Sequence, residues 1–80
     1  MYNRIAMMRA DRGISRRELA EAVGVNPQTI GYLERGDYKP SLELALKISE
    51  FFGVPVEAVF SLRSFPPLAV TLRDVGGGER

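Results

Sequence analysis

The chain has 80 residues, of which 45% are hydrophobic and 26% charged, which is the composition of one small globular domain. Because the chain contains no cysteine, disulfides and thiolate metal sites are excluded. It also contains no histidine, which is the commonest metal ligand and the usual acid–base catalyst at neutral pH. The net charge is only +1, but residues 1–39 hold seven basic and five acidic groups, whereas residues 40–80 hold four and five.

The first part of the sequence predicts two short helices, each ended by a glycine. Residues 3–12 carry apolar side chains at helical spacing and are followed by Gly13, a residue type typical of helix C-caps. A second helix is expected to begin at Ser15, which forms a capping box with Glu18 and satisfies two free backbone amides. Gly24 is expected to close this second helix.

A third helix is predicted to follow almost immediately. Asn26 is a good N-cap, and Pro27 loses no hydrogen bond at the first helical position. Gly36 is expected to end this helix. Since only residues 24–26 join the second and third helices, we expect a steep angle between their axes.

The second half predicts two more helices and a tail. Ser41 is expected to cap a fourth helix that ends at Gly53, with a core face formed by Leu42, Ala45, Leu46, Ile48 and Phe52. A short fifth helix is expected over residues 55–60. Residues 68–75 alternate loosely enough for a short strand, and residues 76–80 are expected to be disordered. The expected fold is a compact all-α domain of five helices over residues 1–62, followed by a C-terminal tail over residues 63–80 that is a candidate for a strand and for dimerisation.

These segments resemble the Cro/repressor-type helix-turn-helix family, also called the xenobiotic-response-element type. The resemblance covers about residues 3–62 and rests on motifs in register: Gly13-Ile14-Ser15-Arg16-Arg17-Glu18-Leu19-Ala20, Val23-Gly24-Val25, Gln28-Thr29-Ile30, Leu33-Glu34-Arg35-Gly36, Pro40-Ser41-Leu42, Lys47-Ile48 and Phe52-Gly53-Val54. It implies a lambda-repressor-like domain that regulates transcription, with a recognition helix at about Pro27–Arg35 in the major groove of DNA.

The exposed side of the third helix suits contact with bases. Gln28 can pair bidentately with adenine, and the methyl and hydroxyl groups of Thr29 can contact thymine or phosphate. Tyr32, one turn beyond Gln28, is a further candidate for a base edge or a phosphate, with partial packing as the alternative. The family usually has a polar residue at the position of Pro27. Because the proline side chain cannot make a hydrogen bond to a base, fewer side chains of this helix can read bases directly. The alternative is that Gln28 and Thr29 are ordinary exposed helix residues.

Contacts to the DNA backbone are expected from basic and polar residues around this helix. By resemblance, Arg16 stands where the family often has a phosphate-binding glutamine. The other candidate phosphate contacts are Arg17, Lys39, Asn26 and Tyr38. Arg16 and Arg17 could instead be solvated surface charges. The resemblance assigns a structural ion pair to Arg9 and Glu34.

The expected partners are double-stranded DNA and a second copy of the chain, because one such domain reads only a few base pairs. The candidate dimer residues lie in the fifth helix and the tail: Val56, Phe60, Phe65, Leu68, Val70 and Leu72. Alternatively, the tail folds back on its own domain. With no signal peptide and no long apolar run, the chain is expected to be cytoplasmic, without membrane contact or cofactor.

Three other functions are compatible with this reading of the sequence. An antitoxin or a restriction-modification controller would share this fold, and a protein-interaction module could have lost DNA binding. The retained Gln28-Thr29 pair and the Arg16-Arg17 cluster weaken the last of these. An enzyme is not expected, because the sequence shows no carboxylate pair, glycine-rich phosphate loop or nucleophile–base set.

Overall fold

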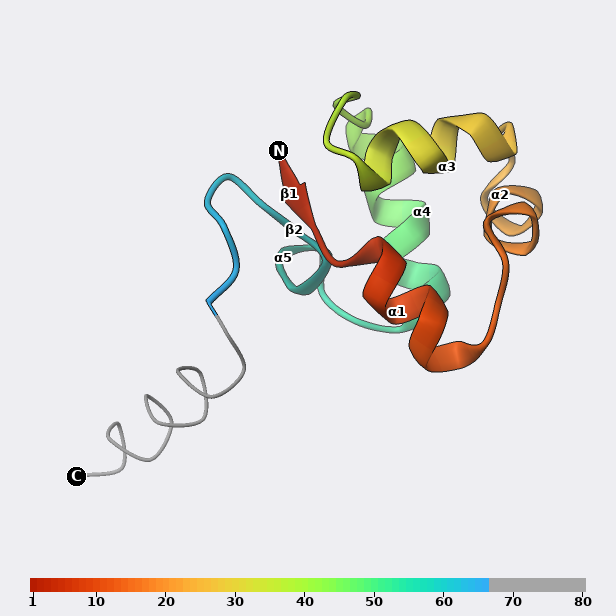
Figure 1. The fold of residues 1–80 in the computed structure, drawn as a ribbon, viewed down its shortest axis with the longest axis horizontal. Coiled ribbons are helices and arrows are strands. Elements are labelled where there is room, and N and C mark those ends of the chain that lie inside the picture. The colour runs from red at the N-terminus through yellow and green to blue at the C-terminus, as the bar shows by residue number, and fades with distance from the viewer. Residues whose placement is uncertain (67–80) are drawn as a thin grey trace.

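The computed structural model describes residues 1–66, which form five helices and two very short strands (Figure 1). In chain order the elements are β1 (Tyr2–Asn3), α1 (Ile5–Arg12), α2 (Arg16–Val23), α3 (Pro27–Glu34), α4 (Leu42–Phe52), α5 (Val56–Val59) and β2 (Phe60–Ser61). Figure 1 shows α3 lengthwise and α2 nearly end-on beside it, so the two helices cross steeply, as the short connection predicts. In residues 1–66, no helix is long and apolar enough to cross a membrane.

The helix ends follow the local signals in the sequence. The Ser15 hydroxyl accepts from the Glu18 amide at 3.0 Å, and the Glu18 carboxylate accepts from the Ser15 amide at 2.9 Å, which completes the capping box. The Ser41 hydroxyl likewise caps α4 by accepting from the Leu44 amide at 3.1 Å. Gly24 ends α2 with a φ of 78°, a left-handed conformation that glycine adopts without a steric penalty.

The first helix begins two residues later than expected, because Asn3 belongs to a strand. β1 pairs antiparallel with β2, with Tyr2 opposite Ser61 and Asn3 opposite Phe60. The Asn3 side chain accepts from the Ile5 amide at 3.1 Å and donates to the Leu33 carbonyl at 2.6 Å. Asn3 therefore ties the beginning of α1 to α3. The strand expected over residues 68–75 lies outside the described residues.

One hydrophobic core joins all five helices. Its members are Ile5, Leu19, Ala20, Val23, Ile30, Leu33, Leu44, Ala45, Ile48, Phe52, Val59 and Phe60. The assignment of Phe60 to an exposed dimer surface is therefore wrong: its side chain is only 9% exposed, because β2 turns it inward beside α5. Val56, from the same candidate set, is half-buried and packs against the core.

The expected inner face of α4 was partly wrong. Leu42 and Leu46 are 74% and 50% exposed, whereas Leu44 is buried. At about 100° per residue, Leu44 lies roughly 160° around the helix from either of these leucines. The inner face is instead the one that carries Leu44, Ala45, Ile48, Ser49 and Phe52.

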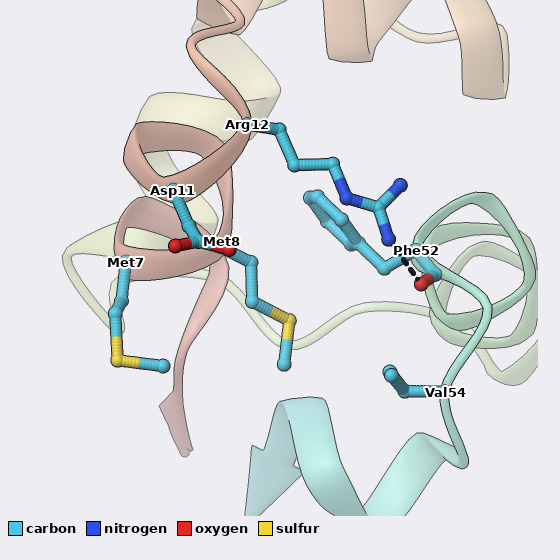
Figure 2. A pocket seen from close by; sticks show the side chains of 6 residues that line it. All are labelled: Met7, Met8, Asp11, Arg12, Phe52 and Val54. Atoms are coloured by element: carbon cyan, nitrogen blue, oxygen red, sulfur yellow. Dashed lines mark hydrogen bonds between the residues drawn. The ribbon is translucent and has the colours of Figure 1, made fainter.

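A basic side chain fastens the end of α4 to α1. Arg12 donates to the Phe52 carbonyl at 2.6 Å and to the Phe51 carbonyl at 3.4 Å, and its guanidinium carbon lies 5.3 Å from the centre of the Phe52 ring. Figure 2 shows this contact beside a groove that Met7, Met8, Asp11 and Val54 also line. A cation at the last carbonyls of a helix satisfies groups that have no partner within the helix.

Candidate nucleic-acid interface

Helix α3 presents two chemically different sides. Asn26 caps it by accepting from the Gln28 amide at 2.8 Å, and Pro27 fills the first helical position. Ile30 and Leu33 are buried in the core, which fixes the rotation of the helix about its own axis. Gln28, Gly31, Tyr32 and Arg35 follow the spacing i, i+3, i+4 and i+7, so they share the opposite side.

This outer side of α3 carries a shallow hollow. It is lined by Arg16, Pro27, Gln28, Gly31, Tyr32 and Arg35. Three of the expected base contacts, Pro27, Gln28 and Tyr32, thus lie together and are exposed. Arg16 reaches the same hollow from α2. Thr29 is half-buried and lines a different depression, together with Tyr38.

Arg35 belongs to this surface, although no role was expected for it. Its Nε lies 3.3 Å from Asp37 Oδ2, and its guanidinium carbon lies 5.1 Å from the centre of the Tyr32 ring. Its Nη1 passes 3.5 Å from the point where a Cβ on Gly31 would stand, so the side chain folds back along the helix. A signal was present in the sequence, since Arg35 follows Gln28 by seven residues and therefore lies on the same side of the helix.

The other candidate phosphate contacts lie around α3. Arg17 is exposed in the first turn of α2, and Tyr38 and Lys39 are exposed in the loop that follows α3. Asn26 uses its side-chain oxygen in the cap, which leaves its amide group as the donor for a phosphate. The positive end of the α3 helix dipole points to the same place.

Behind this surface, Glu34 joins three helices. Arg9 of α1 donates to the two Glu34 carboxylate oxygens, from Nε at 2.6 Å and from Nη2 at 3.2 Å. This is the pair that the resemblance implied. Arg16 of α2 adds a contact from its Nε to Glu34 Oε1 at 2.8 Å. Burial raises the pKa of the Glu34 carboxyl, but the hydrogen bonds and positive charges of the two arginines outweigh burial, and the pKa lies below its ordinary value.

A steeply crossed helix pair whose second helix exposes polar and cationic groups defines a helix-turn-helix DNA-binding protein. The chain belongs to the helix-turn-helix family, whose pattern matches residues 5–59. It is 48% identical over 62 residues to the HTH-type transcriptional regulator YgzD of Bacillus subtilis, a match that covers 78% of this chain and 94% of that one. It is also 45% identical over 60 residues to an HTH-type transcriptional regulator of Methanocaldococcus jannaschii, covering 75% and 91% of the two chains.

A solved structure is also similar to this chain. The restriction-modification controller protein C.AhdI from Aeromonas hydrophila superposes with a TM-score of 0.66 at 28% identity, covering 71% of this chain and 86% of that chain. The chain is a DNA-binding transcriptional regulator of the Cro/repressor type. Because the two sequence relatives are named as transcriptional regulators, the antitoxin, controller and protein-interaction alternatives are not favoured.

Proposed function

We propose that the protein binds a palindromic operator as a homodimer and regulates transcription by occupying that site. The observation that carries this proposal is the hollow on the outer side of α3, where Gln28 and Tyr32 are exposed between two arginines, Arg16 and Arg35. Amide and guanidinium groups are the side chains best suited to the edges of bases in the major groove. The proposed mechanism needs no catalysis and no cofactor.

Different residues on the outer side of α3 are suited to different bases. Gln28 is placed to read adenine, and Arg35 adds a fork of donors that matches O6 and N7 of guanine. Pro27 offers carbon atoms to a thymine methyl group. Arg35 is held over the Tyr32 ring, so that fewer rotamers are lost on binding.

The residues around α3 contact the backbone of the operator. Arg16, Arg17 and Lys39 supply positive charge, and Asn26 and Tyr38 supply neutral donors. Because these contacts release counterions, affinity falls as salt rises, with a slope close to the number of phosphates neutralised.

Dimerisation places two copies of α3 about 34 Å apart, one helical turn of DNA. Within the described residues, the exposed leucines Leu42 and Leu46 lie about one turn apart on α4. We propose that a second copy covers this apolar surface. The centre of the Phe65 ring lies 4.0 Å from the guanidinium carbon of Arg4 in its own chain, which supports the alternative that this part of the tail folds back. Leu68, Val70 and Leu72 lie outside the described residues.

Selection from a pool of random duplex DNA, at two salt concentrations, tests the proposed function. We expect enrichment of a palindrome and weaker retention at the higher salt. Retention of no duplex at low salt would refute the proposal. The dimer is tested separately by light scattering: Leu46→Glu is expected to lower the mass from that of two chains to one. A truncation before Phe65 that alone abolishes the dimer would assign the interface to the tail instead.

A further inference from the structure

The two arginines on Glu34 use its carboxylate in different ways. Arg9 is 17% exposed, grips both oxygens of Glu34 and also donates to the Ile14 carbonyl at 3.0 Å. Its donors are directed into the protein. Glu34 itself, with a side chain only 4% exposed, is therefore fixed from one side by a buried partner.

Arg16 takes the remaining side of the same carboxylate and stays 52% exposed. It contacts Glu34 through Nε alone, and among residues 1–66 its terminal nitrogens Nη1 and Nη2 make no hydrogen bond. The guanidinium group is planar and rigid, so a contact at Nε fixes the orientation of the whole group. The same side chain lines the hollow on the outer side of α3.

We propose that Glu34 is a positioning residue for DNA binding, which holds Arg16 by Nε so that its two terminal nitrogens are presented to a phosphate beside α3. Arg9 holds the carboxylate, the carboxylate holds Arg16, and Arg16 contacts the DNA backbone. This rests on the proposed function, since it requires the operator to lie against α3. A guanidinium already oriented loses less conformational freedom on binding than a free one.

Simple charge and positioning predict opposite effects for Glu34. A carboxylate near DNA repels phosphate, so removing its charge alone would strengthen binding. If Glu34 orients Arg16, removing its charge weakens binding instead. The direction of the change in DNA affinity for Glu34→Gln therefore distinguishes charge repulsion from positioning of Arg16.

The first test is a double-mutant cycle of Glu34→Gln and Arg16→Gln, read by fluorescence anisotropy on the duplex obtained by selection. All four proteins are measured at a temperature where circular dichroism shows them folded. We expect Glu34→Gln to weaken binding by about 3- to 10-fold in the wild-type background and by less than about 2-fold when Arg16 is already glutamine. We also expect Arg16→Gln to lower the salt slope by about 0.9, whereas Glu34→Gln leaves the slope unchanged.

A second test avoids any loss of folding. Arg16→Lys keeps the positive charge but removes the planar group that Glu34 orients, and is expected to weaken binding about 3- to 10-fold with an unchanged salt slope. Lys47→Arg, an exchange of the same charge on the exposed surface of α4, is the matched control. Equal affinity of Arg16→Lys and wild type, tighter binding by Glu34→Gln, or additive effects in the cycle would each overturn the inference. If wild type binds no duplex, it is the proposed function that fails.

Discussion

Replacing Glu34 by glutamine should destabilise the protein, independently of DNA. The wild-type carboxylate accepts two hydrogen bonds from the largely buried Arg9, and glutamine keeps one oxygen and places an amide against the guanidinium. A hydrogen bond to a charged group exceeds a neutral one by about 1 kcal/mol. The exposed Arg16 contact adds little, because solvent screens it. We therefore expect a loss of about 2–3 kcal/mol in the free energy of unfolding.

This loss is large for a chain of 80 residues. Domains of this size are stable by roughly 4–12 kcal/mol, so the melting temperature should fall by roughly 10–20 °C. Urea unfolding followed by circular dichroism at pH 7 measures the change. Glu43→Gln is the control, because Glu43 pairs with Lys47 at 3.3 Å on the exposed surface of α4 and should cost less than about 0.5 kcal/mol. Equal small losses in the two variants would refute this account of Glu34.

The ion pair of Arg9 and Glu34 predicts that the stability of the fold depends on pH. The pKa of Glu34 is lower in the folded state than in the unfolded state, so its contribution is fully present above the unfolded value of about 4.3. The contribution is lost as pH falls through the folded pKa, which lies below that value. The gap in stability between wild type and Glu34→Gln should therefore be constant near neutral pH and narrow below about pH 4. A gap that widens on acidification would contradict the predicted direction.

Five further substitutions test other parts of the structure. Ser15→Ala should cost about 1 kcal/mol of unfolding free energy by removing the cap of α2, measured by urea unfolding. Gly31→Ala should stabilise by about 0.5–1 kcal/mol in a thermal melt, because a Cβ there meets no atom closer than 3.5 Å; a lower melting temperature would argue against this packing. Phe60→Ala should cost about 3–5 kcal/mol and Leu62→Ala almost nothing, and the reverse order would restore Phe60 to the surface. Arg35→Ala should flatten the preference for guanine at one position of each half-site in a repeated selection, whereas a uniform loss of affinity would make Arg35 a phosphate contact.

Signals that act within a few residues predicted most of the fold. The Ser15 capping box, the Ser41 cap and the Asn26-Pro27 start each fix a helix end through bonds to the next turn. Such contacts are written in the local sequence, so they can be identified without knowledge of the packing. The order of the helices and the steep crossing of α2 and α3 followed from them.

Features set by packing could not be predicted in this way. Leu42, Leu44 and Leu46 alternate along α4, and only the positions of the neighbouring helices decide which of them face inward. β1 and β2 have two residues each, too few for any alternation to appear. At the DNA-binding surface, the sequence predicted the exposed positions of Pro27, Gln28 and Tyr32, but it did not single out Arg35, and Thr29 is half-buried. The contact between Arg16 and Glu34 was not predicted, because it depends on how α2 packs against α3.

Selection from random duplex DNA with wild type and with Gln28→Ala, side by side, tests most directly that the outer side of α3 reads sequence. We expect both proteins to enrich the same palindrome, and the variant to lose its preference at one base pair in each half-site. That loss should amount to about 1–3 kcal/mol of discrimination, or roughly 5- to 150-fold. An unchanged preference at every position would contradict the claim that α3 reads the operator through Gln28.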